Sequence, residues 1–161
     1  MNEFDERLKQ AIARGNRKHE RDAQQEQKQA LNLDELKQLH SQYRLQFSEH
    51  IEACLQKLPQ YFPGFRFETL YGDRGWGAAC SRDDLRLDGG RRDNLYSRLE
   101  VTVRPFSEYH VVDLAAKGTV RNKELLTRSH FVKIADVEPQ EYLELIDRWV
   151  LEYAELYAAK G

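Results

Sequence analysis

The ten residues Tyr96–Pro105, YSRLEVTVRP, decide the fold class. Successive side chains of a strand point to opposite faces of its sheet, so strict alternation predicts one buried face and one wet face. The buried set is Leu99, Val101 and Val103, and the wet set is Arg98, Glu100, Thr102 and Arg104. This pattern predicts a strand of an antiparallel sheet.

Similar signals on both sides of this strand extend the predicted sheet over residues 64–134. The connections between the apolar runs are too short for parallel crossovers, so neighbouring strands should be antiparallel. Gly118 is expected to end a strand or to form a bulge. The sheet is expected to have four to five strands, and the further candidates are residues 65–71, 76–82, 109–117 and 125–134.

Two amphipathic helices flank the sheet in the sequence. Apolar residues recur at three- and four-residue steps over residues 33–58 and again over residues 138–159, as on one face of a helix. Pro59 and Pro63 are expected to end the first helix, because proline removes a backbone donor. The first stripe consists of Leu36, Leu39, Tyr43, Phe47, Ile51, Leu55 and Leu58. The sequence therefore predicts an α+β fold with helices covering one face of the sheet.

Residues 1–32 precede this domain and have a different composition. Phe4, Leu8 and Ile12 have helical spacing, but charged residues and glutamine dominate after them. Such a stretch is either a solvated helix or a disordered linker, and the sequence leaves both open. The predicted organisation is a polar extension at 1–32 and one α+β domain at 33–161.

Residues 83–94 are expected to form a mobile loop, because they combine Gly89-Gly90 with several aspartates and arginines. Arg86, Arg91 and Arg92 are candidates for an anion-binding site. A solvated loop with local ion pairs explains the same residues. The aspartates do not have the spacing of a calcium-binding loop, so no metal site is predicted.

The wet face of the sheet is a second candidate binding surface. Arg98, Glu100 and Arg104 share it, and a neighbouring strand is expected to add Arg128 and His130 if its register, which the sequence does not give, places them on this face. Cross-strand pairing between arginine and glutamate explains these residues without a ligand. Both interpretations remain open.

The sequence shows no recognisable catalytic or cofactor motif. Cys54 and Cys80 have no CxxC spacing, and no histidine is judged to stand at ligand spacing beside them, so they are interpreted as buried free thiols. No nucleophile elbow, phosphate loop or dinucleotide fingerprint is present. We therefore predict no catalytic residue and no cofactor.

Charge is distributed unevenly along the chain. Residues 64–135 hold 13 basic and 10 acidic residues, whereas residues 136–161 hold 2 and 7. This distribution argues against a protein that coats nucleic acid in general, although nucleic-acid binding through arginines of the sheet and loop stays an alternative. No apolar run reaches the length of a membrane span and no secretory signal is apparent, so we expect the cytoplasm and no membrane contact.

These observations favour a non-catalytic binding or adaptor protein that acts through protein–protein contacts. The long stripe of the first helix needs cover, and Leu36, Tyr43, Phe47 and Ile51 are predicted to meet a protein partner or a second copy of the chain in a homodimer. The alternative is an enzyme or small-ligand protein with its site where residues 83–94 meet the sheet.

Overall fold

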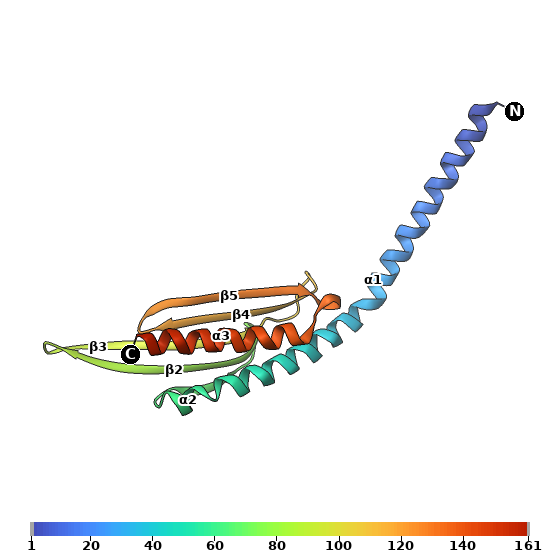
Figure 1. The fold of residues 1–161 in the computed structure, drawn as a ribbon. Coiled ribbons are helices and arrows are strands. Elements are labelled where there is room, and N and C mark those ends of the chain that lie inside the picture. The colour runs from blue at the N-terminus through green and yellow to red at the C-terminus, as the bar shows by residue number, and fades with distance from the viewer. Residues whose placement is uncertain (1, 161) are drawn as a thin grey trace. The chain divides into compact units, whose positions relative to one another are not determined.

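The computed structural model describes residues 2–160, apart from the side chains of residues 27–31, 86 and 88. It has the predicted α+β fold, with helices and a five-stranded antiparallel sheet in the order β1-β2-β3-β4-β5 (Figure 1). The elements are α1 (Glu3–Leu55), α2 (Leu58–Tyr61), β1 (Arg66–Leu70), β2 (Trp76–Asp88), β3 (Arg91–Val103), β4 (Val111–Val120), β5 (Lys123–Lys133), a 3-10 turn (Ile134–Asp136) and α3 (Pro139–Ala159).

The chain divides into two compact units between Gln38 and Leu39, inside α1. The first unit is helical, and the side chains of residues 2–26 are all exposed. Residues 13–26, for which a solvated helix and a disordered linker were the alternatives, are helical with exposed side chains in this structure. The predicted start of α1 at residue 33 was wrong, because the polar residues before it continue the same helix.

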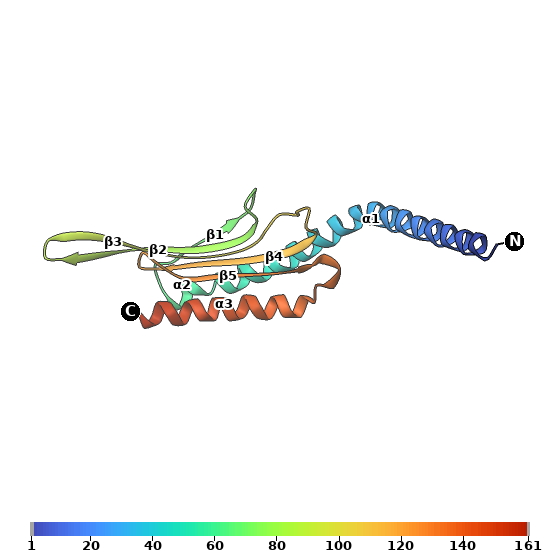
Figure 2. The ribbon, with the colours of Figure 1, turned by 90° about the horizontal axis from the view of Figure 1, so that it is seen from above.

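The second unit has two layers. Residues 39–55 of α1 and the whole of α3 lie on the same face of the sheet (Figures 1 and 2). Phe47 is fully buried between them, with its ring parallel to those of Tyr43 and Tyr142 at centroid distances of 5.8 and 4.8 Å. The sheet contributes the alternating apolar residues of β3 and β4 to the same core.

The end of α1 differs from the prediction. The helix ends at Leu55, and Pro59 lies in the first turn of the short helix α2. Proline is well tolerated there, because the first backbone N–H groups of a helix have no intrahelical acceptor. Pro59 therefore opens a helix in this chain, whereas the sequence pattern was interpreted as a stop.

Residues 83–94 form a β-hairpin, so the predicted loop was wrong. β2 and β3 pair without interruption up to Asp88 and Arg91. Only Gly89 and Gly90 lie between them, with φ of +57° and +83°. Two consecutive positive φ values match the type I′ turn that joins twisted strands most easily. The polarity of this stretch reflects the exposure of the hairpin tip, where Leu87 is 80% exposed.

A second tight turn joins β4 to β5. Arg121 and Asn122 have φ of +46° and +70°, and the Asn122 side chain accepts from the Tyr96 N–H and donates to the Asn94 carbonyl. These bonds attach the turn to β3. The register shift between Gly118 and Thr119 is the bulge predicted at Gly118.

Candidate functional site

The open face of the sheet carries a network of its own ion pairs at its centre. The Arg98 guanidinium lies 2.8 Å from a Glu68 oxygen and 3.3 Å from a Glu100 oxygen. The Arg98 side chain reaches across β2 at Ala79. Ala79 pairs in register with Glu68 on one side and Glu100 on the other, and it is fully buried beneath these side chains. Cross-strand pairing therefore accounts for the Arg98 and Glu100 part of the predicted surface.

The remaining members of that surface separate onto two faces. Arg104 lies 3.4 Å from Asp113 near one end of the open face. Arg128 and His130 pair in register with the buried residues Ala116 and Leu114, so they lie on the helix-covered face. Their expected place on the wet face was wrong, because the β4–β5 register could not be derived from the sequence.

The side chains of Arg128 and His130 contact α3. Arg128 forms an ion pair with Glu152, and His130 lies 3.4 Å from a Glu141 oxygen with its ring against that of Tyr142. These contacts attach the edge strand β5 to the C-terminal helix. The two residues therefore have a structural explanation that needs no ligand.

The three arginines of the predicted anion site lie on the β2–β3 hairpin. Arg91 and Arg92 are consecutive residues of β3, so they point to opposite faces, and both are exposed. The backbone of Arg86 lies opposite Asp93, and its side chain is outside the described residues. A strand does not bring Arg91 and Arg92 together round one anion as a loop would.

The predicted interface stripe on α1 changes its surroundings along the helix. Phe47 and Ile51 are fully buried in the core of the single chain, whereas Leu36 and Tyr43 are half-buried. The C-terminal half of the stripe therefore has intramolecular cover from the sheet and α3. The need for a second chain, on which the predicted interface rested, does not arise for Phe47 and Ile51.

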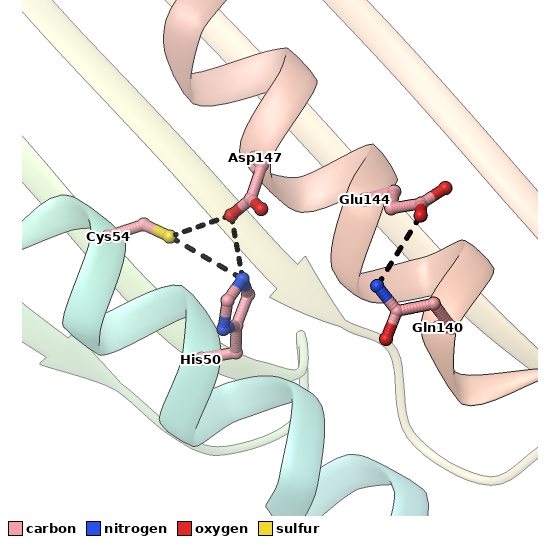
Figure 3. Close-up of polar contacts among 5 residues, drawn as sticks. All are labelled: His50, Cys54, Gln140, Glu144 and Asp147. Atoms are coloured by element: carbon pink, nitrogen blue, oxygen red, sulfur yellow. Dashed lines mark hydrogen bonds and ion pairs between the residues drawn. The ribbon is translucent and has the colours of Figure 1, made fainter.

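A polar cluster joins α1 to α3 on the outer side of this helix pair. His50 Nε2 lies 2.7 Å from Asp147 Oδ1, and the Cys54 thiol donates to the same oxygen at 3.3 Å. Cys54 Sγ is 3.7 Å from His50 Nε2. Figure 3 shows the three side chains meeting between the two helices, while Glu144 on α3 turns to Gln140.

This cluster lacks the geometry of a cysteine–histidine catalytic pair. In such a site one ring nitrogen accepts the thiol proton and the other donates to the carboxylate. Here sulfur and carboxylate both approach Nε2. Burial and the adjacent Asp147 carboxylate raise the pKa of the Cys54 thiol to about 12, which keeps it protonated rather than nucleophilic.

The cluster borders an apolar hollow of about 470 Å³. Cys54 on α1 and Asp147 on α3 are polar members of its lining, and its apolar lining comes from α2, the residue after it, and α3. The lining consists of Leu58, Tyr61, Phe62, Val150, Leu151 and Ala154, together with the stem of Lys57. Two of the three members of the cluster, Cys54 and Asp147, thus line the hollow.

This cluster was not predicted from the sequence. The judgement that no histidine stands at ligand spacing beside a cysteine was wrong, because His50 precedes Cys54 by four residues, one helical turn. A histidine and a cysteine four residues apart on a helix could have been recognised from the sequence as a possible pair of metal ligands. Asp147 lies 93 residues beyond Cys54, and only the packing of α3 against α1 brings it near.

Comparisons with protein-family models, curated proteins and solved structures gave no match for this chain. Among the described residues, no helix combines the length and the apolar character needed to cross a bilayer.

Proposed function

We propose that this chain is a non-catalytic adaptor that docks onto a partner protein through the first turns of α1. The observation that carries this proposal is a stripe of large apolar side chains exposed on a helix. Phe4, Leu8 and Ile12 are 63%, 48% and 56% exposed. We call these three residues the N-terminal stripe.

The spacing of the N-terminal stripe favours insertion into a groove. Residues four apart lie on one side of a helix, and the stripe covers about 12 Å along the axis. Helices that bind grooves place their anchors at such three- and four-residue steps along one face. A groove on a partner would supply the burial that residues 3–26 lack within their own unit.

The shortness of the stripe argues against a coiled coil with a second copy. Self-association of that kind needs apolar positions sustained over several heptads. Here the pattern stops after Ile12, and the following turns carry Gly15 and charged residues. The homodimer predicted from the sequence is therefore the competing outcome of the test.

Cytoplasmic location is part of the same proposal. Cys54 and Cys80 are both free thiols, and Cys80 donates to the Leu55 carbonyl inside the core. Free thiols, one of them half-buried and one buried here, are typical of proteins kept in a reducing compartment.

A photo-crosslinking amino acid placed at Leu8, compared with one at Gln10 on another side of the helix, tests this adaptor role in cells. We expect a heterologous protein to be crosslinked from position 8 and not from position 10. Serine at Phe4 and Ile12 should abolish the crosslink. Alanine at Glu6 and Arg14 is the matched control and should preserve it.

Two results would contradict the proposal. One is a crosslink only to a second copy, with light scattering that returns twice the 19.0 kDa chain mass; this would establish the homodimer. The other is equal labelling from positions 8 and 10, which would show a solvated helix without a specific partner. The serine variant should keep the melting temperature of the second unit, since the stripe is exposed.

A small-ligand role has one observation in its favour. At the base of the β2–β3 hairpin, a shallow hollow of about 600 Å³ is lined by Arg82, Arg121 and Tyr157 among others. Arg82 is paired with Asp84 at 2.7 Å, but the buried Nη1 of Arg121 has no hydrogen-bond partner among the described residues. Calorimetric titration with inorganic phosphate, with Arg121→Gln as the comparison, tests anion binding there; identical heats would exclude it.

A further inference from the structure

His50, Cys54 and Asp147 present three different donor atoms to one point. The imidazole nitrogen and the thiol come from consecutive turns of α1, and the carboxylate comes from α3 (Figure 3). All three ligand atoms lie within 4.8 Å of one another. All three residues belong to the second unit, so the arrangement does not depend on the N-terminal part of α1.

The separations of these atoms can be compared with a tetrahedral zinc site. Zinc bonds of about 2.3 Å to sulfur and about 2.0 Å to nitrogen and oxygen place sulfur about 3.5 Å from the other two donors. The observed distances from Cys54 Sγ are 3.3 Å to Asp147 and 3.7 Å to His50. They already have the required size.

One distance must increase for a cation to enter. His50 Nε2 and Asp147 Oδ1 are 2.7 Å apart, whereas a tetrahedral ion would hold them about 3.3 Å apart. Their side chains are 31% and 52% exposed, so side-chain rotation can supply this opening without a shift of the core. Cys54, on the same helix face as His50, keeps its place.

The set of donors indicates which cation would fit. Thiolate, imidazole and carboxylate together are borderline-soft ligands, which suit zinc and not the harder calcium or magnesium ions. Deprotonated Cys54 and Asp147 supply two negative charges against the two positive charges of the ion. The thiol proton passes to solvent on binding.

We propose that His50, Cys54 and Asp147 form a three-ligand site for Zn²⁺ with its fourth position open to the apolar hollow beside α2. Cys54 and Asp147 border both the donor cluster and this hollow. Three protein ligands with one open position are the arrangement of zinc sites that exchange water for another ligand. This site is separate from the N-terminal stripe, so a result that contradicts one of the two proposals leaves the other unaffected.

Metal binding by the tag-free full chain tests the site. Equilibrium dialysis against Zn²⁺ should show one tight site per chain, and Co²⁺ should give the near-ultraviolet charge-transfer band of a cobalt–thiolate bond. Cys54→Ser should remove the band and weaken zinc binding by more than about 100-fold, because losing a ligand exceeds the effect of losing its support. Asp147→Asn and His50→Gln should each weaken binding similarly.

Matched variants distinguish the loss of a metal ligand from a general loss of structure. Cys80→Ala removes the other thiol, and Glu144→Gln removes the carboxylate one turn before Asp147 on α3; both should retain the band and the affinity. Circular dichroism melts without metal identify any variant that fails to fold, and Zn²⁺ should raise the melting temperature of the wild type but not of Asp147→Asn. Absence of stoichiometric binding, or a cobalt band that persists in Cys54→Ser, overturns the site and leaves a hydrogen-bonded cluster.

Discussion

Phe47 decides whether α1 belongs to the core of this chain or to an interface with another. Its side chain has no exposed surface within the single chain and stacks on Tyr43 and Tyr142. Phenylalanine to alanine in a core costs about 3–5 kcal/mol, and an aromatic pair contributes about 0.5–1.5 kcal/mol beyond its area. Since the ring stacks on both sides, we expect Phe47→Ala to lower the free energy of unfolding by about 4–5 kcal/mol.

Urea unfolding followed by tryptophan fluorescence measures this loss. Leu45→Ala is the control, because Leu45 is on the same helix but 58% exposed, and it should change the free energy by less than about 0.5 kcal/mol. The midpoint should not depend on protein concentration. A loss below about 1 kcal/mol, or a wild-type midpoint that rises with concentration, would refute intramolecular burial and restore the predicted interface.

Two further predictions test other parts of the fold. Gly118→Ala should destabilise the chain by about 1–3 kcal/mol, because the added Cβ would lie 2.8 Å from the Tyr153 ring and 3.0 Å from Leu126. Gly15→Ala is the control, because a Cβ at Gly15 on α1 meets no atom within 4 Å. It should increase helicity and leave the stability of the second unit unchanged. Chemical denaturation and circular dichroism measure both. Burial and the Arg44 charge lower the pKa of His40 below 6.5, despite an opposing backbone hydrogen bond, so the unfolded chain takes up a proton that the folded chain does not. The His40 contribution to stability is therefore full above pH 6.5 and is lost as pH falls through the folded pKa. Between pH 8 and pH 5, the urea midpoint should fall more in the wild type than in His40→Gln. An equal fall in both proteins would contradict the lowered pKa of His40.

Local periodicity predicted most of the fold. The alternation in β3 and the stripes of α1 and α3 are properties of neighbouring residues, and burial of one face follows from them directly. The hairpin tip failed this reasoning because charged residues dominate it and its two apolar residues, Leu85 and Leu87, are exposed. Its signal was the glycine pair at Gly89 and Gly90, whose freedom to adopt positive φ suits a two-residue turn.

The sequence pattern of a single strand could not predict which residues of different strands share a face of the sheet. A shift of one residue in register moves every side chain of a strand to the other face. The bulge at Gly118 introduces such a shift within β4 and β5. Arg128 and His130 were for this reason expected beside Arg98, although they lie across the sheet from it and bind α3.

The candidate metal site combines both kinds of information. His50 and Cys54 are one helical turn apart, so half of the site could be derived from the sequence of α1 alone. Asp147 joins them only because the apolar faces of α1 and α3 share the core around Phe47, which fixes the separation and rotation of the two helices. Phe47→Ala should therefore also weaken zinc binding at a protein concentration and temperature where the variant remains folded, while Leu45→Ala should not. Equal zinc affinity in the two variants would show that the core does not set the position of Asp147.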